Sequence, residues 1–394
     1  MDIKLADRVT RIKPSATLAI TARAKELRAK GKDIIGLGAG EPDFDTPAHI
    51  KAAAKEAIDK GFTKYTAVDG TPGLKAAICR KFKHDNDLDY EADQILVSVG
   101  GKQSFFNLTQ ALLNAGDEVI IPAPYWVSYP DIVLLADGKP VIIDANIEQN
   151  FKITPAQLDQ AITDNTRLFV INSPSNPTGV AYTRQELMAL GEVLRKHPHV
   201  LIATDDMYEH ILWSEEPFCN IVMACPDLYE RTIVLNGVSK AYSMTGWRIG
   251  YAGGPGKLIA AMKKIQSQST SNPASISQVA AEAALQGNQN CIQEMLAAFK
   301  RRHDFVVESL NEFEGVNCLP SDGTFYAFPC FRKVIERLDG IDDDVALADA
   351  LLNKASIALV PGSAFGAPGY MRLSYATSME NLKLAIKRLG KFLT

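Results

Sequence analysis

The chain is poor in the features that mark secreted, membrane and disulfide-rich proteins. Six cysteines are scattered over 394 residues without a CxxC pair, whereas a disulfide framework needs a denser spacing. The opening stretch, MDIKLADRVTRIKPSATLAI, holds neither an uninterrupted apolar core nor a run long enough to cross a bilayer. We therefore expect a cytoplasmic protein that makes no membrane contact.

The chain also lacks an excess of positive charge. Lysine and arginine number 42 against 46 acidic residues, which gives a formal net charge of -4. This leaves no basic field to attract nucleic acid, so we expect small-molecule partners and local groups for any anion. Of six histidines only His197 and His199 lie close together, with no cysteine or carboxylate at a metal-site interval. We predict no catalytic metal.

Short apolar runs recur between about residues 90 and 240, and each is followed by turn residues and a helical pattern. They are ILVSV (95–99), EVIIP (118–122), VIID (141–144), RLFVIN (167–172), VLIATD (200–205) and TIVLNG (232–237). Their length and β-branched content indicate buried strands. Stretches between them, such as 103–114 and 184–195, have the spacing of amphipathic helices. The alternation predicts an α/β domain with a mainly parallel sheet flanked by helices.

The pattern changes toward both ends of the chain. After about residue 275 a long helical stretch runs to Glu312, followed by isolated strands (TFYAF, IALVP, YMRLSYA) and a final helix over 379–392. The chain exceeds the size of one hydrophobic core. We predict a large domain over 46–290 and a smaller α+β domain over 291–394. A turn-rich N-terminal segment, 1–45, is expected to join the small domain and cover the active site.

Polar side chains close or follow three of the predicted strands. Asp205 ends VLIATD, Asn176 follows RLFVIN, and Lys240 lies just past TIVLNG. Because ligands bind beyond the carboxyl ends of parallel strands, we expect the three to meet. Taken singly, such residues are as often N-caps or solvated charges. GGKQ (100–103) opens a helix after ILVSV, and its free N–H groups either hold a phosphate or only make a tight turn.

A longer motif surrounds Lys240. In GVSKAYSMTGWRIGY, Gly237, Ser239, Gly246, Arg248 and Gly250 lie at fixed intervals from the lysine. Seven further motifs are AGEPDFDTP (39–47), KYTAVDGTPGL (64–74), GGKQ (100–103), PYWVSYP (124–130), NSPSNPTG (172–179), DDMYEH (205–210) and RLSYA (372–376). In all of them the chain closely resembles the class I aminotransferases of fold type I. The resemblance covers nearly the whole chain and implies the fold-type I architecture with pyridoxal 5'-phosphate (PLP) as cofactor.

The resemblance implies catalytic roles for three residues. Lys240 would carry PLP as a Schiff base and then move the proton between the substrate Cα and the cofactor carbon. Asp205 would pair with the pyridine nitrogen and keep it protonated. Tyr208 would donate a hydrogen bond to the phenolic oxygen of the ring.

Further cofactor contacts follow from the same resemblance. The phosphate would be met by the backbone N–H groups of Gly101 and Lys102, by the Ser239 hydroxyl and by the Arg248 guanidinium. This set again predicts an anion site at a helix start.

The cofactor ring and the neighbouring subunit complete the implied site. Asn176 would join Tyr208 at the phenolic oxygen, and Trp126 would stack on the ring face. Tyr65 matches a tyrosine that family members take from the second subunit. A homodimer with shared active sites is therefore implied.

Substrate contacts are implied on both sides of the cofactor. Arg372 would clamp the α-carboxylate, with Trp126 and Asn176 alongside it. Gly40 would approach the substrate through its backbone, where a side chain would obstruct. We expect substrate binding to close the small domain over the site.

The pattern is most similar to aspartate aminotransferases of the branch that lacks the large-domain arginine for the second carboxylate. This implies transfer of the amino group of L-aspartate to 2-oxoglutarate. Lys102 and Lys13 are the candidate cations for the second carboxylate. In related enzymes the equivalent of Lys13 is associated with acceptance of prephenate, so dual specificity is an alternative.

Three other interpretations differ in kind. A PLP-dependent lyase could use the same lysine, aspartate and tyrosine. A dinucleotide-binding enzyme would share the α/β alternation, although GxGxxG is missing after its first strand. A non-catalytic binding protein could keep the fold, although all of the expected catalytic residues are present.

Overall fold

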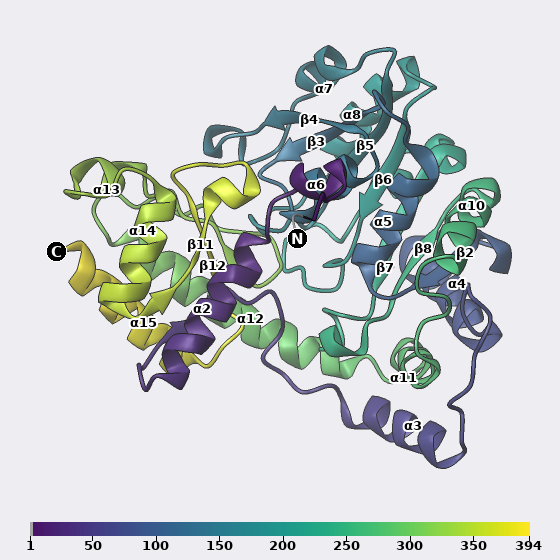
Figure 1. The fold of residues 1–394 in the computed structure, drawn as a ribbon, viewed down its shortest axis with the longest axis horizontal. Helices are drawn as coiled ribbons and strands as arrows, with labels where there is room; N and C mark the ends of the chain where they lie inside the picture. The colour runs from purple at the N-terminus through teal and green to yellow at the C-terminus, as the bar shows by residue number, and fades with distance from the viewer. Residues whose placement is uncertain (1–2) are drawn as a thin grey trace.

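A seven-stranded sheet forms the centre of the larger part of the molecule (Figure 1). The computed structural model describes residues 3–394. The strands are β2 (Ile95–Ser98), β3 (Glu118–Ala123), β4 (Lys139–Asp144), β5 (Thr166–Asn172), β6 (Leu201–Asp205), β7 (Thr232–Gly237) and β8 (Gly250–Gly253). Their order is β2-β8-β7-β6-β5-β3-β4. Pairing is parallel from β4 to β7, and β8 runs antiparallel between β7 and β2. The predicted mainly parallel sheet is confirmed.

Helices cover both faces of this sheet and bury alternate residues of each strand. On one face are α5 (Gly101–Leu112), α6 (Ser128–Leu135) and α10 (Gly256–Ser267). On the other are α3 (Ala48–Asp59), α4 (Pro72–Asn86), α7 (Pro155–Ala161), α8 (Arg184–Lys196), α9 (Ile221–Ala224) and α11 (Ser275–Gln286). Leu168 and Val170 of β5 join the first cluster, whereas Phe169 and Ile171 join the second. Burial on both faces explains why such strands are nearly continuous apolar runs.

Strand β8 was not predicted, and its glycines are the reason. Its sequence, GYAG, has the composition of a turn rather than of a strand. A side chain at Gly250 would overlap the backbone of Gly100 and Gly101. Glycine is therefore required where β8 passes the start of α5. Because glycine is rare in strands, residue propensities do not predict a strand here.

The remaining strands form two small sheets near the C-terminus. Strands β9 (Tyr326–Ala327), β11 (Val360–Pro361) and β12 (Met371–Ser374) pair antiparallel in the order β11-β12-β9. Around them lie α12 (Asn290–Asn311), α13 (Arg332–Arg337), α14 (Asp344–Ala350) and α15 (Met379–Leu393). These elements share an apolar cluster of their own.

The N-terminal segment is attached to this smaller part. Strand β1 (Ile35–Gly36) pairs in parallel with β10 (Ile357–Ala358). The short helix α1 (Asp7–Thr10) and the longer α2 (Ala16–Ala29) precede it. The domain limits 1–45, 46–290 and 291–394 stay predictions, and this pairing together with the separate apolar clusters supports them.

Two details of the expected organisation were wrong. The N-terminal segment is not only turns, because α2 is a helix of 14 residues that buries Ala24 and Leu27. The helical stretch to Glu312 is two helices, since α11 ends at Gln286 and α12 begins at Asn290. The break falls at GNQ (287–289), where glycine and asparagine form helices poorly. Between residues 3 and 394 no helix has the length and apolar character of a membrane span.

Candidate active site

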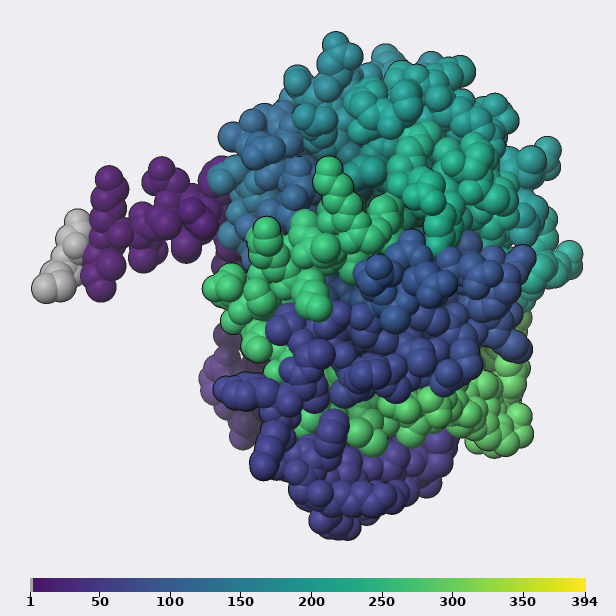
Figure 2. All heavy atoms as spheres, turned by 90° about the vertical axis from the view of Figure 1, so that its right-hand side faces the viewer, coloured from purple at the N-terminus to yellow at the C-terminus, as the bar shows by residue number. Residues whose placement is uncertain are grey.

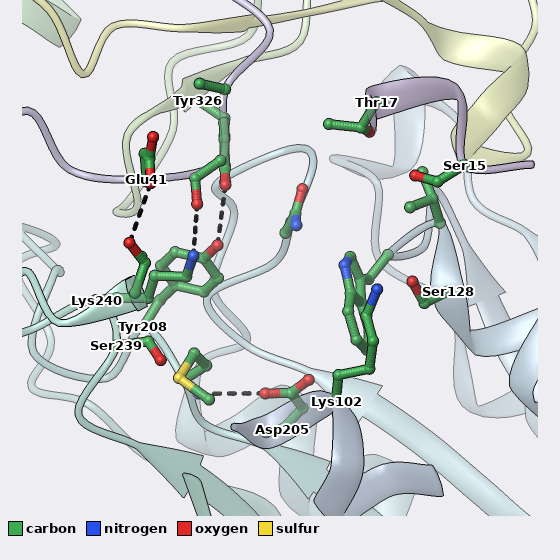
Figure 3. A pocket seen from close by; sticks show the side chains of 18 of the residues that line it. Ser15, Thr17, Glu41, Lys102, Ser128, Asp205, Tyr208, Ser239, Lys240 and Tyr326 are labelled. Carbon is green, nitrogen blue, oxygen red and sulfur yellow. Dashed lines mark hydrogen bonds between the residues drawn. The ribbon is translucent and has the colours of Figure 1, made fainter. Parts of the chain in front are cut away.

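A cavity of about 410 Å³ lies at the carboxyl edge of the seven-stranded sheet (Figure 3). Strands β5, β6 and β7 end at this edge, and α5 begins there. Because β8 is antiparallel to its neighbours, Arg248, just before its start, lies at the same edge. Eleven residues predicted from the sequence line the cavity: Gly40, Gly101, Lys102, Trp126, Asn176, Asp205, Tyr208, Ser239, Lys240, Arg248 and Arg372.

The Lys240 amine lies inside the cavity. Its Nζ donates a hydrogen bond of 2.5 Å to the Gly40 carbonyl and lies 5.9 Å from the centre of the Tyr208 ring. Burial, assisted by the positive charge of Arg372, lowers the pKa of Lys240 to about 8. A larger fraction of the amine is therefore neutral and nucleophilic near pH 7 than for an ordinary lysine.

This low pKa predicts the labelling behaviour of the cofactor-free protein. Only a neutral amine attacks an aldehyde, so reductive methylation of Lys240 by formaldehyde and cyanoborohydride should reach half its maximal rate near pH 8. Lysine in model peptides has a pKa of about 10.4. Peptide mass spectrometry measures the rate, with a short lysine peptide in the same tube as control. Identical pH profiles for the two would contradict the prediction.

The Asp205 carboxylate lies on the floor of the cavity. Burial raises the pKa of Asp205, and hydrogen bonds from the Tyr129 hydroxyl (2.5 Å) and the Met207 N–H (3.3 Å) oppose that rise. A cation bound beside the carboxylate would favour its ionised form further. The site can therefore accept a protonated ring nitrogen.

Two tyrosines that line the cavity are in hydrogen-bond contact with each other. The Tyr208 and Tyr326 hydroxyls are 3.0 Å apart, and burial raises the pKa of each phenol. Both hydroxyls therefore stay protonated, and in the contact between them one donates to the other. Tyr326 belongs to β9, so this contact joins the small sheet to the loop after β6.

An anion cradle lies where β2 meets α5. Gly100 has a φ of 84°, and a side chain there would overlap the Arg248 guanidinium. Arg248 donates only to the carbonyls of Thr245 (2.8 Å) and Val99 (3.4 Å), and no carboxylate in residues 3–394 pairs with it. Free N–H groups at the start of α5 and an arginine without a counter-ion fit a phosphate.

A second cation without a counter-ion is Arg372 of β12. It is 2% exposed, and its Nη1 and Nη2 donate to Asn176 Oδ1 (2.9 Å) and the Gly38 carbonyl (2.8 Å). Its guanidinium lies 4.4 Å from the centre of the Tyr326 ring, and its buried Nε has no partner in the part of the chain described. A buried charge of this kind needs a bound anion. The cavity therefore offers a carboxylate site opposite the phosphate cradle.

Several residues that line the cavity were not predicted from the sequence, among them Asn172 and Tyr326. Asn172 donates to the Asp205 carbonyl and accepts from the Asn176 N–H, each at 2.8 Å. It closes the strand RLFVIN, so the strand-end rule could have found it. Tyr326 lies in TFYAF, where nothing in the local pattern marks a site residue.

Two predicted residues lie outside the cavity. Tyr65 is 92% exposed, and neither it nor Lys13 is among the lining residues. The Lys13 backbone N–H donates to Asp131 at 3.4 Å. The Lys102 ammonium, in contrast, lies in the cavity 5.3 Å from the centre of the Trp126 ring.

One group of potential metal ligands occurs in the part of the chain described. Donor atoms of Asp85, Glu209 and His210 lie within 4.8 Å of one another. The Lys81 ammonium pairs with Glu209 and lies 3.6 Å from Asp85, so a lysine already neutralises the cluster. None of these residues lines the cavity.

The sheet is covered by helices, and one of its edges presents a buried lysine, a phosphate cradle and a buried arginine. This is the arrangement of PLP-dependent enzymes. The sequence of residues 32–389 matches the family model "Aminotransferase class I and II". The chain belongs to this family, and its cofactor is PLP.

Individual relatives agree over the full length of the chain. An aspartate/prephenate aminotransferase of Nitrosomonas europaea is 62% identical, with 100% of both chains covered. The crystal structure of an aspartate aminotransferase from Rhizobium meliloti has a TM-score of 0.96 at 49% identity and covers 100% of this chain and 99% of its own. An aspartate aminotransferase from Thermus thermophilus with maleate has a TM-score of 0.93 at 42% identity, covering 99% and 100%.

Proposed function

We propose that the protein transfers the amino group of L-aspartate to 2-oxoglutarate, giving oxaloacetate and L-glutamate. The observation that carries this proposal is the pair of cations, Arg372 and Lys102, that line one cavity. A dicarboxylic substrate needs two such groups, one for each carboxylate. The names of the relatives support the assignment, as does maleate, a dicarboxylate, with the Thermus enzyme.

The residues of the chain divide the work between binding and proton transfer. PLP supplies an electron sink when it is bound. When PLP is bound, Lys240 would hold the cofactor and would carry the proton removed from the substrate Cα. Asp205 would keep a proton on the ring nitrogen, while Tyr208 and Asn176 would donate hydrogen bonds to the phenolic oxygen. Trp126, which lines the cavity, would stack on the ring.

The two ends of the cavity hold the two anions. The N–H groups of Gly101 and Lys102, the Ser239 hydroxyl and Arg248 would hold the phosphate. Arg372 takes the substrate α-carboxylate, and Gly40 lies close to the substrate through its backbone. The small domain closes over this arrangement and excludes water.

We propose a homodimer with shared sites in the cytoplasm. Figure 2 shows the first described residues as a narrow arm that projects from the body. Its apolar side chains Ile3, Leu5 and Val9 are 71, 58 and 49% exposed, and a second subunit would bury them. The exposed Tyr65 would then reach the phosphate of the PLP that is bound in the active site of the second subunit. The six cysteines are all free, which suits a reducing compartment.

The products of the reaction test the proposal. With L-aspartate and 2-oxoglutarate, the purified protein should form oxaloacetate and L-glutamate in equal amounts. A lyase on the same scaffold would release ammonia and pyruvate instead. Coupled enzyme assays for each product separate the two, and ammonia release without glutamate would overturn the proposal.

Two lysines test the substrate preference. The Lys102→Ala change should raise KM for L-aspartate by about tenfold, because a charged hydrogen bond is lost, with a smaller effect on L-alanine. If dual specificity holds, Lys13→Ala should change the ratio of kcat/KM for prephenate and oxaloacetate. Steady-state kinetics measures both effects, with the exposed Lys60→Ala as control. Unchanged preferences in both variants would remove these lysines from substrate recognition.

A further inference from the structure

The buried phenol of Tyr129 bonds directly to the Asp205 carboxylate. Tyr129 lies on α6 and is 1% exposed. Its hydroxyl donates to Asp205 Oδ2 at 2.5 Å, across 76 positions of sequence. Tyr129 is not among the residues that line the cavity, so it reaches the site through Asp205.

Among residues 3–394 two groups donate hydrogen bonds to this carboxylate, and the bond from Tyr129 is the shorter. The other donor, the Met207 N–H, is 3.3 Å from Oδ1. A short O–H to carboxylate bond is charge-assisted and about twice as strong as one between neutral groups. Burial works against the ionised form of Asp205, and the Tyr129 hydroxyl is the side chain that opposes it by hydrogen bonding.

The ring of Tyr129 is held rigidly. It meets Phe105 edge-on at 4.9 Å and Trp126 edge-on at 5.1 Å between ring centres. Trp126 in turn lines the cavity. Tyr129 therefore holds the Asp205 carboxylate through its hydroxyl and contacts the Trp126 indole through its ring. Both of these partners line the cavity.

We propose that Tyr129 is a positioning residue that orients Asp205 and keeps it ionised, so that the proton shared with the cofactor ring nitrogen stays on the nitrogen. The inference rests on the proposed role of Asp205. One proton lies between the carboxylate and the nitrogen, and a donor to the carboxylate stabilises the form in which the nitrogen carries that proton. Loss of the hydroxyl moves the proton toward Asp205 and weakens the electron sink.

The Tyr129→Phe change removes the hydroxyl and keeps both aromatic contacts. In holoenzyme reconstituted with PLP labelled with ¹⁵N in the ring, the nitrogen resonance should move toward that of neutral pyridine. The value of kcat for L-aspartate should fall about ten- to a hundredfold, with little change in KM. Tyr182→Phe is the matched control, because the buried Tyr182 hydroxyl accepts a 2.9 Å bond from the Ile153 N–H away from the cavity.

Asp205→Asn separates failure of this inference from failure of the proposed function. If Asp205→Asn shifts the resonance and Tyr129→Phe does not, the role of Tyr129 is overturned. If Asp205→Asn has no effect either, the assignment of Asp205 itself fails. The double variant should behave like Asp205→Asn alone, because Tyr129 acts only through the carboxylate.

A fluorinated tyrosine at position 129 gives a second test that does not depend on the stability of Tyr129→Phe. Its more acidic hydroxyl is a stronger donor, so the resonance should move further toward pyridinium. A shift in the same direction as Tyr129→Phe would contradict the inference.

Discussion

The Lys240→Ala change should lower kcat for amino transfer by about 10⁴-fold or more, because it removes both the covalent attachment and the proton carrier. No other lysine among residues 3–394 is placed to replace it. Lys102, the other lysine that lines the cavity, lies beside Trp126 at the start of α5. The phosphate cradle is unchanged in the variant, so PLP should still bind without a covalent bond.

Borohydride reduction followed by peptide mass spectrometry measures the attachment directly. In the unaltered protein the cofactor mass should appear on the peptide that contains Lys240, and in Lys240→Ala it should appear on no peptide. Lys60→Ala, which changes an exposed lysine paired with Glu56, should keep full labelling and activity. A Lys240→Ala protein with normal turnover would contradict the assignment.

The sheet could be predicted from the sequence because its strands are buried on both faces. RLFVIN shows this well, since its alternate residues enter two different apolar clusters. The whole run is then apolar and stands out between polar stretches. Strand β8 could not be predicted, because close packing against α5 requires glycine there.

The site could be predicted where topology brings strand ends together. Asp205, the last residue of β6, was found in this way. The same rule points to Asn172, its partner in register at the end of β5, which we did not predict. Tyr326 and Tyr129 could not be found this way. They reach Tyr208 and Asp205 across 118 and 76 positions of sequence, from elements whose placement depends on tertiary packing. Tyr65 and Lys13 stay predictions that depend on a second subunit or on domain closure.

The Arg372→Leu change should lower kcat/KM for L-aspartate by about 10²- to 10⁴-fold. Two charge-assisted hydrogen bonds to the α-carboxylate are lost, each contributing about 1.5–3 kcal/mol. Arg372 is able to make them because its guanidinium is buried and its Nε has no protein partner among residues 3–394. No carboxylate in that range neutralises it, so the substrate is the anion that the site is missing.

An amine without an α-carboxylate is the control substrate for this prediction. Such an amine makes no contact with Arg372, so its low rate should be the same in the unaltered protein and in Arg372→Leu. The preference for L-aspartate over the amine should therefore fall by the same factor as kcat/KM for L-aspartate. Arg372→Lys should recover only part of the loss, because lysine keeps the charge without the two-pronged geometry. If the rate with the amine falls equally, the effect is on the structure of the site, since Arg372 also bonds to Asn176 and Gly38. That result would exclude Arg372 as the carboxylate site.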